Sequence, residues 1–207
     1  MGNNITQENV IRNQLLIDEG DEFNSILTSK SINNIKALRI FETVESKVSD
    51  NEDNTKNIDI TIKEKATGEI MAGAGVGTDG STLSFAVKEN NYLGRGIALD
   101  SSLTVSEETI KGKFSVTNPN YKNSDKSVNA NIQSLTTDKL DSSGYKTTKS
   151  GFGFGTTFEY QDDVILGIGQ DSFLERIETN SSASTRQKSQ EGNYWDTFIN
   201  LSFDYDK

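Results

Sequence analysis

Apolar residues change their spacing partway along the chain, from the period of a helix to the period of a strand. The stretch GFGFGTTFEY shows the second pattern, with aromatic residues at Phe152, Phe154, Phe158 and Tyr160 and small or polar residues between them. Successive side chains of a strand point to opposite faces, so this stretch predicts a strand with one apolar face and one small, polar face. Such a strand fits a half-buried sheet in water, and it also fits a strand with lipid outside and water inside.

The first part of the chain, residues 1–66, predicts a small α+β domain. Thr6 is a plausible N-cap for a first helix whose apolar residues are Val10, Ile11, Leu15 and Leu16. A second helix is expected from Asn24 to Leu38, followed by strands from Phe41 to Val48 and from Lys56 to Glu64. A unit of this size has only a marginal core of its own.

The second part, residues 67–207, predicts an antiparallel sheet of about eight strands. The expected strands are residues 69–77, 82–89, 97–105, 110–118, 127–136, 149–160, 164–178 and 194–206. In each strand one face is apolar and the other carries Gly, Ser, Thr, Asn, Asp or Lys, although the alternation is less clean in the strand that begins at Val164.

Tyrosine and tryptophan residues fall at the ends of these expected strands. They are Tyr92, Tyr121, Tyr160 and Tyr205 at one end and Tyr194 and Trp195 at the other. Amphipathic rings prefer the headgroup level of a bilayer, so this placement indicates interface girdles of a membrane barrel. Tyrosines beside turns are also common in soluble β proteins. The pattern therefore leaves open a membrane barrel and a soluble sandwich or secreted adhesin.

The composition excludes several kinds of functional site, but it excludes few folds. Hydrophobic residues make up 32% of the chain and the mean hydropathy is -0.59. No apolar run approaches the ~18 residues of a membrane helix, which excludes a helical span. Cys and His are absent, which removes disulfides, thiol chemistry, the usual zinc sites and histidine acid/base catalysis. A net charge of -10 argues against a nucleic-acid surface.

The first residues show no signal-peptide pattern. Either the protein is cytoplasmic, or an export signal lies upstream of this chain. An acidic chain without cysteine fits a secreted or envelope protein of a bacterium.

Two parts of the chain, each with two characteristic segments, resemble the BamA family of outer-membrane β-barrel assembly factors. GEIMAGAGVGTDGSTLSFAVKENNYLGRGIALD, from Gly68, and KGKFSVTNPNY, from Lys111, are similar to the opening strands of the family's barrel. GNNITQENV, from Gly2, and IDITIKEK, from Ile58, are similar to the last POTRA domain before that barrel. The resemblance implies a POTRA-like domain that lacks its first strand, followed by transmembrane strands that make about eight of the sixteen strands of a barrel.

The resemblance implies a role in assembling and inserting β-barrel proteins in the outer membrane of a Gram-negative bacterium, with the POTRA part in the periplasm. An unpaired strand edge offers its N–H and C=O groups to an incoming strand, which is β-augmentation. In the family the first barrel strand borders a lateral seam. The residues that correspond to this strand are Glu69, Ile70, Met71, Ala72, Gly73, Ala74, Gly75, Val76 and Gly77.

The partners implied by the resemblance are nascent outer-membrane proteins, accessory assembly lipoproteins and the lipid bilayer, and no nucleic acid. No catalytic residue, metal or cofactor is expected. A two-partner secretion pore of the same superfamily and a soluble β-rich adhesin are the alternatives. The residues expected to face lipid are Phe85, Phe114, Phe152, Phe154, Phe158, Ile199, Leu201 and Phe203. On this assignment Phe154→Lys prevents membrane assembly and Gly153→Ser is mild.

Several conspicuous patterns have plain structural explanations beside the functional ones. The glycines that alternate on the first barrel strand can weaken its pairing, or they can only relieve crowding, as the similar pattern Gly151, Gly153 and Gly155 suggests. Gly94 and Gly96 are expected to provide positive φ in a turn. The paired carboxylates are expected to be solvated charges and not a catalytic pair, and they are Glu107/Glu108, Asp162/Asp163 and Asp204/Asp206.

Overall fold

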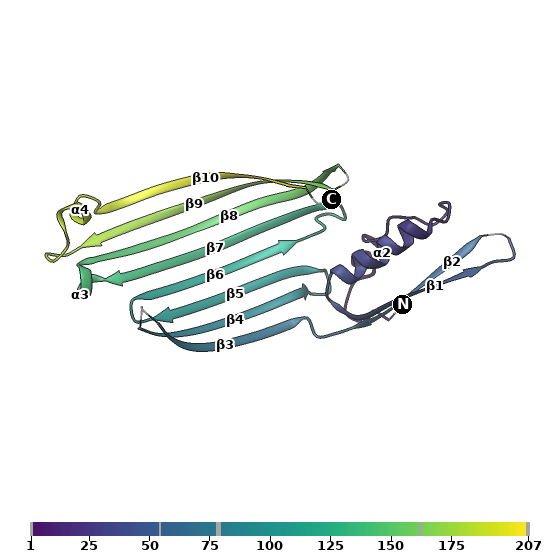
Figure 1. Ribbon diagram of the computed structural model, residues 1–207, viewed down its shortest axis with the longest axis horizontal. Helices are drawn as coiled ribbons and strands as arrows, with labels where there is room; N and C mark the ends of the chain where they lie inside the picture. The colour runs from purple at the N-terminus through teal and green to yellow at the C-terminus, as the bar shows by residue number, and fades with distance from the viewer. Residues whose placement is uncertain (1, 54, 78–79, 162, 206–207) are drawn as a thin grey trace.

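The computed structural model describes residues 2–53, 55–77, 80–161 and 163–205, which form a two-stranded sheet and an eight-stranded sheet (Figure 1). The smaller sheet and the helix α2 lie at one end of the larger sheet, next to the turns between its strands. None of the helices in these residues has the length and apolarity that a membrane span requires.

The N-terminal unit consists of the helices α1 (Glu8–Arg12) and α2 (Ser25–Ala37) and the hairpin β1 (Phe41–Asp50) and β2 (Lys56–Glu64). Asn24 caps α2, because its side-chain oxygen accepts the N–H groups of Ile26 at 2.9 Å and Leu27 at 3.2 Å. The predicted order of helix, helix, strand, strand is confirmed. The buried core of the unit consists of Val10, Ile11, Ile32, Ile35, Ile40, Phe41, Val44 and Ile62.

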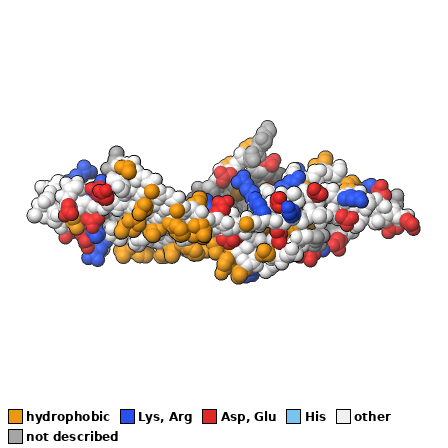
Figure 2. All heavy atoms as spheres, turned by 90° about the horizontal axis from the view of Figure 1, so that it is seen from below, with side chains coloured by type: hydrophobic (Ala, Val, Ile, Leu, Met, Phe, Trp, Pro, Cys, Tyr) orange, Lys and Arg blue, Asp and Glu red, His pale blue; other side chains and the backbone are white. Residues whose placement is uncertain are grey.

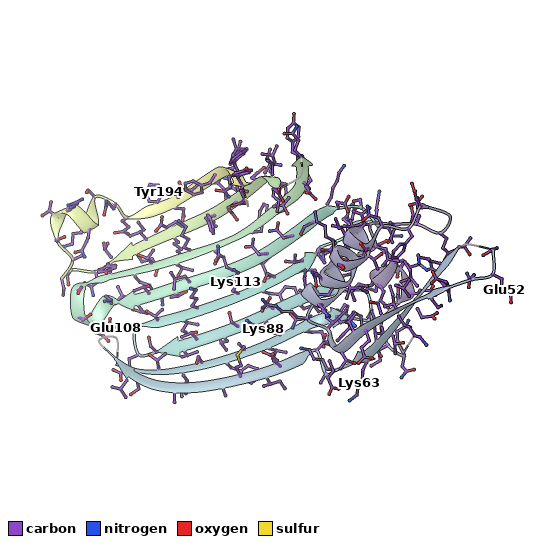
Figure 3. All side chains as sticks on the ribbon, turned by 45° about the vertical axis from the view of Figure 1, so that its right-hand side comes forward. Glu52, Lys63, Lys88, Glu108, Lys113 and Tyr194 are labelled. Atoms are coloured by element: carbon purple, nitrogen blue, oxygen red, sulfur yellow. The ribbon has the colours of Figure 1, made fainter. Side chains whose placement is uncertain are left out.

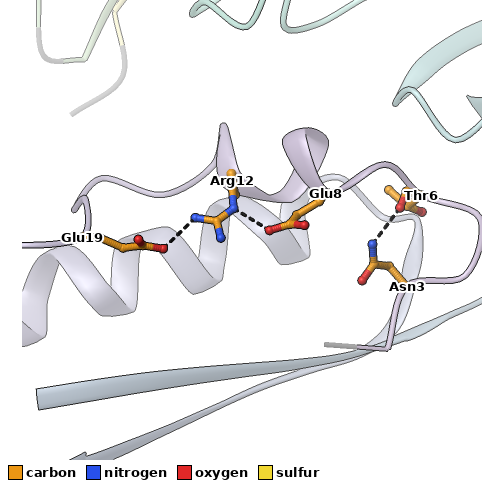
Figure 4. A network of polar contacts seen from close by, with 5 residues as sticks. All are labelled: Asn3, Thr6, Glu8, Arg12 and Glu19. Carbon is orange, nitrogen blue, oxygen red and sulfur yellow. Dashed lines mark hydrogen bonds and ion pairs between the residues drawn. The ribbon is translucent and has the colours of Figure 1, made fainter.

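The first helix is shorter than predicted. It ends at Arg12, and its N-cap is Gln7, whose side chain makes no capping bond. Thr6 is not the cap, because its hydroxyl accepts a hydrogen bond from Asn91 in the larger sheet. Arg12, the last residue of α1, forms ion pairs with Glu8 at 2.6 Å and with Glu19 at 3.0 Å (Figure 4). These pairs hold the loop that follows α1 against the helix.

The eight-stranded sheet is antiparallel throughout and has the order β10-β9-β8-β7-β6-β5-β4-β3. Its strands are β3 (Gly68–Gly77), β4 (Gly80–Tyr92), β5 (Ile97–Ser106), β6 (Thr109–Asn118), β7 (Lys126–Lys139), β8 (Tyr145–Gln161), β9 (Val164–Thr179) and β10 (Gly192–Tyr205). Two short helices, α3 (Leu140–Ser143) and α4 (Thr185–Lys188), lie in the loops after β7 and β9.

All the strands predicted for this part are present, with small differences at their ends. The strand β8 begins at Tyr145, four residues before the predicted start at Lys149. The prediction missed these residues, YKTT, because they show no alternation of apolar and polar side chains. The last predicted strand includes Asp206, which lies outside the described residues. The fold class is therefore the predicted one, an α+β unit followed by antiparallel barrel-type strands.

Candidate functional site

The strand β3 is the candidate site, because it contains the predicted seam residues and forms one edge of the larger sheet, whose other edge among the described strands is β10. Among the described strands it pairs with β4 alone, from Gly68 opposite Glu89 to Gly77 opposite Gly80. All ten of its residues are exposed. Its free edge therefore presents backbone N–H and C=O groups that a further strand can pair with. The structure brings the predicted seam residues together on this one strand.

Two of the glycines of β3, Gly75 and Gly77, have surroundings unlike those of the β8 glycines, whereas a Cβ at Gly73 would lie 2.9 Å from the Oγ atom of Ser84. A Cβ added at Gly75 or Gly77 would meet no described atom within 4 Å. A Cβ at Gly151 would collide with the backbone carbonyl of Ser172, and one at Gly153 would collide with the side chain of Asp171. The crowding explanation thus fits β8, whereas Gly75 and Gly77 occupy positions with room for a side chain. Glycine at an uncrowded strand position lowers the stability of the strand.

The cross-strand register collects the apolar residues of the larger sheet on one face. Phe114 lies opposite Ile132, which lies opposite Phe152 on the next strand. Figure 2 shows the hydrophobic side chains gathered along one side of this sheet. By register, all the residues predicted to face lipid lie on this face. Their exposed fractions run from 40% at Phe114 to 77% at Leu201, apart from Phe158, which is less exposed and half-buried.

The surroundings of β9 explain why apolar and polar residues alternate less regularly along this strand. Both of its faces carry apolar residues, since Phe173 on the polar face packs on Phe198 with ring centres 6.2 Å apart. The Nζ atom of Lys149 lies 4.7 Å from the centre of the Phe173 ring, which is cation–π geometry. On the apolar face Ser172 is buried and shares a hydrogen bond of 3.0 Å with Thr197. The polar group on this face therefore has a local partner.

The polar face carries charged and amide groups along several strands. Lys88 and Asp100 form an ion pair at 3.8 Å across β4 and β5, and Lys113 lies on the same face of β6 (Figure 3). Asn200 donates to Asp171 at 2.5 Å between β10 and β9. A shallow hollow of about 230 Å³ lies on this part of the sheet, with glycines of β8 and β9 in its floor.

The predicted interface aromatics are all exposed, but they do not all share a face. Tyr92, Tyr121, Tyr160 and Tyr205 lie at the end of the sheet nearer the N-terminal unit. Trp195 lies opposite Leu174 on the apolar face, whereas its neighbour Tyr194 lies opposite Glu175 on the polar face and donates its hydroxyl to the carbonyl of Gln190 at 3.0 Å. Because β10 alternates, these two neighbours lie on opposite faces, and of the two only Trp195 shares a face with the apolar residues.

Sequence reasoning missed a group of polar residues at the base of β3. The carboxylate of Glu64 accepts the N–H groups of Asn4 at 2.8 Å, Ile5 at 3.0 Å and Thr6 at 2.6 Å. Burial raises the pKa of Glu64, but the hydrogen bonds from Thr6 and from the backbone of Asn4 and Ile5 outweigh it and lower the pKa to about 2. Glu64 is therefore ionised at neutral pH.

The turn between β4 and β5 meets the N-terminal unit at two glycines. Gly94 and Gly96 have φ of 70° and 65°, which confirms the predicted positive φ. A Cβ at Gly94 would collide with the carbonyl of Ile5, and a Cβ at Gly96 would lie 3.0 Å from Val10. These glycines therefore also permit close docking of the two parts. A glycine-rich turn was the one sequence signal that pointed to this contact.

Of the described carboxylates in the three pairs, Glu107 and Glu108 have hydrogen-bond partners, Asp163 lies in a turn, and Asp204 is exposed on β10. Glu108 binds Lys139 at 3.0 Å and Ser142 at 3.1 Å, at the end of the sheet away from the N-terminal unit (Figure 3). Asp162 and Asp206 lie outside the described residues. Within the residues that the structure describes, no group of three or more acidic side chains is placed to hold a metal ion.

Two family models match the chain. The model of the Omp85 superfamily domain matches residues 91–207, and the POTRA model, described as a surface antigen variable number repeat, matches residues 1–65. These matches fall on the larger sheet and on the N-terminal unit, respectively.

Curated relatives carry the name outer membrane protein assembly factor BamA. The protein from Buchnera aphidicola is 34% identical over 101 residues, which is 47% of this chain and 16% of that protein. The protein from Neisseria meningitidis is 25% identical over 159 residues, which is 73% of this chain and 20% of that protein. The chain thus spans about a fifth or less of the length of these relatives.

Solved structures share the fold. A crystal structure of BamA from Haemophilus ducreyi lacking POTRA domains 1–3 aligns with a TM-score of 0.76 at 22% identity, covering 100% of this chain and 43% of that one. CdiB from Acinetobacter baumannii aligns with a TM-score of 0.55 at 10% identity, covering 98% of this chain and 41% of that one.

Proposed function

The chain belongs to the Omp85 superfamily and is related to its BamA members, and on this premise we propose that it acts in the assembly and insertion of β-barrel proteins in the bacterial outer membrane. It is a binding and remodelling role, without covalent chemistry, in keeping with the assembly factors to which the chain is similar. The N-terminal unit lies in the periplasm on this proposal, and the larger sheet is part of a barrel wall.

The single observation that carries the proposal is the free edge of β3. An incoming strand can add to it by main-chain hydrogen bonds, and the uncrowded glycines Gly75 and Gly77 keep the pairing of β3 with β4 weak. A barrel wall opens with the smallest loss of free energy next to a weakly paired strand. We therefore assign β3 to a lateral seam, along which substrate strands form and leave.

The apolar face supports a bilayer as the surroundings of the larger sheet. Its side chains are exposed, and among the described residues no second layer covers them as the helices cover the smaller sheet. A soluble adhesin needs such a layer, whereas lipid solvates the face directly. The partners in this proposal are nascent outer-membrane proteins, accessory assembly lipoproteins and the outer membrane itself.

Cysteine crosslinking tests the seam in the full-length protein. These 207 residues contain no cysteine, so once any cysteine elsewhere in the full-length protein is replaced, a single substitution gives a defined site. Ala72→Cys on β3 and Ala130→Cys on β7 place the same side chain on the same exposed face, at the edge and inside the sheet. With a substrate barrel that carries a cysteine in a terminal strand, we expect a disulfide at residue 72 and none at residue 130. Equal crosslinking at both positions would contradict the seam.

The shared fold with CdiB keeps a secretion pore as a second candidate function. A pore passes its substrate through the lumen, so it predicts crosslinks from the polar face. Asn131→Cys, next to Ala130 on β7, is the matching probe, because it points to the face opposite the apolar one. Crosslinks to a passenger polypeptide at residue 131 without any at residue 72 would favour the pore.

A further inference from the structure

Two polar side chains interrupt the apolar face of the larger sheet near the middle of β9. Gln170 lies opposite Phe154 of β8, so it belongs to this face, and Ser172 follows it two residues along the same strand. Apolar residues continue in both directions, since Ile168 is 52% exposed on one side of the pair and Leu174 is 46% exposed on the other. The pair therefore lies within the apolar band and not at its rim.

These side chains form a hydrogen-bonded row with two residues of β10. The amide nitrogen of Gln170 donates to the hydroxyl of Ser172 at 3.3 Å, and this hydroxyl shares a hydrogen bond of 3.0 Å with Thr197. The indole N–H of Trp195 donates to the hydroxyl of Thr197 at 3.2 Å. Ser172 is buried, so the row is covered at its centre, whereas Gln170 at its end is only half-buried. The Gln170 amide is therefore a polar group of this row that a neighbouring molecule can reach.

The Gln170 amide uses only part of its hydrogen-bonding capacity. Among the described residues, no group donates to its oxygen, and its nitrogen has a second hydrogen without an acceptor. Water satisfies such groups at a protein surface, but the hydrocarbon of a bilayer offers neither donors nor acceptors. A polar side chain on a membrane face therefore favours contact with another membrane segment that supplies the missing partners.

We propose that the surface around Gln170 is a contact for a second copy of this chain in the membrane. Copies inserted in the same orientation are related by a twofold axis along the membrane normal, so every residue keeps its depth and a residue at the axis meets its own copy. An amide carries both a donor and an acceptor, so two Gln170 side chains can form a pair of reciprocal hydrogen bonds. A different protein would have to present both groups at this same depth.

The side chains around Gln170 suit such a contact. Thr156 and Thr197 on the neighbouring strands are small, which allows two barrel walls to approach closely. Ile168 and Ile199 are exposed and supply apolar contacts beside the amide. The surface lies on β9 and β10, at the opposite edge of the described sheet from β3, so a pair of copies leaves the proposed seam uncovered. The inference rests on the lipid surroundings proposed for the apolar face, and it does not depend on the seam.

Sedimentation equilibrium of the full-length protein in density-matched detergent micelles tests the amide pair. We expect dimers whose dissociation constant rises about tenfold in Gln170→Leu, because two hydrogen bonds between membrane segments are lost. Leucine is compatible with lipid, so the variant should still fold, as its heat-modifiable migration in gels checks. Thr136→Val is the matched control, because it removes a polar group from the same face on β7, away from the contact, and it should leave the dissociation constant unchanged.

Cysteine crosslinking locates the contact, in full-length protein in which any other cysteine is replaced. Ile168→Cys and Leu103→Cys are a matched pair, since both residues are aliphatic, lie on the apolar face and have exposed fractions of 52% and 47%. Ile168 lies on the same strand as Gln170, whereas Leu103 lies four strands away on β5, at about 19 Å. In membrane vesicles, a short bismaleimide should join two copies through residue 168 and not through residue 103.

A protein that stays monomeric, or dimers that persist unchanged in Gln170→Leu, would overturn the proposal. Equal crosslinking through residues 168 and 103 would show random collision, and a crosslink through residue 168 to a different protein would assign the surface to that protein. Either of these results would also overturn the proposal. The seam is tested separately at residue 72, so a missing crosslink there leaves this contact standing, and the absence of dimers leaves the proposed function standing.

Discussion

The N-terminal unit and the larger sheet use the same strand pattern and place it in opposite surroundings. In β2 the apolar face is covered by helices, and Ile62 is 4% exposed. In β10 the residues Ile199, Leu201 and Phe203 alternate in the same way, and Leu201 is 77% exposed. Alternation fixes which face of a strand is apolar, but it does not say what covers that face. The covering layer decides whether a strand belongs to a core or to a bilayer.

The largest effect is expected from a charge on the uncovered face. Phe154→Lys removes an aromatic group that is worth ~2 kcal/mol when it is buried in lipid. A lysine at mid-depth of the bilayer costs a further 2–4 kcal/mol, roughly. We expect the full-length variant to fail to fold into membranes, as measured by its heat-modifiable migration in gels.

The control for this change lies on the neighbouring strand and the other face. Asn131→Lys introduces the same side chain next to Ala130, which pairs with Phe154, but its position faces the polar side. This variant should fold as the unmodified protein does. Comparable folding of Phe154→Lys and Asn131→Lys would show that both faces meet water, and the comparison between the two regions would lose its basis.

The sequence predicted the order of the elements and the apolar face of the larger sheet, although α1 is shorter and β8 begins earlier than predicted. Strict alternation placed Phe114 and Phe152 on one face correctly, because a strand has no freedom to turn single side chains. It did not reveal the contact of Thr6 with Asn91, which joins residues 85 positions apart and depends on how two folded parts meet. It also gave no distinction between the glycines of β3 and those of β8, because the difference lies in neighbouring strands.

Paired alanine substitutions at those glycines are expected to have intermediate effects of opposite sign. Gly151→Ala places a Cβ against the carbonyl of Ser172, so it should destabilise the sheet by about 1–3 kcal/mol. Gly75→Ala meets open space and restricts the unfolded chain, so it should stabilise β3 by about 0.5–1 kcal/mol. Urea unfolding in detergent measures both.

The same pair sharpens the role of the uncrowded glycines. If Gly75 keeps the seam weak, Gly75→Ala should also slow exchange of the β3 amides and reduce assembly by the full-length protein. Destabilisation by Gly75→Ala would mean that its site is crowded in the folded protein. The mild effect expected from sequence for Gly153→Ser stays a prediction, because the atoms that a Cβ would meet there are the ends of the Asp171 and Asn131 side chains, which can shift.

The smallest effect is expected from acid, and it concerns the N-terminal unit alone. The folded state lowers the pKa of Glu64 from 4.5 to about 2, so between these values the unfolded chain binds a proton that the folded chain does not. The stabilisation by Glu64 is therefore complete above pH 4.5 and is lost as the pH falls toward 2. Because the carboxylate is partly exposed to solvent, we expect roughly 1 kcal/mol.

Glu64→Gln should remove this dependence on pH. The loss of the helical circular dichroism signal in urea, followed at several pH values in detergent, reports on the unit that contains α2, while the larger sheet contributes mainly β signal. Glu42→Gln is the control, because Glu42 only pairs with the exposed Lys63 on the surface, at 2.7 Å. If the pH dependence persisted in Glu64→Gln and vanished in Glu42→Gln, the acid sensitivity would come from Glu42, and the prediction for Glu64 would be wrong. The persistence of the larger sheet at low pH would at the same time confirm that the two regions are stabilised by different surroundings, one by a core with an ionised anchor and the other by lipid-like solvent.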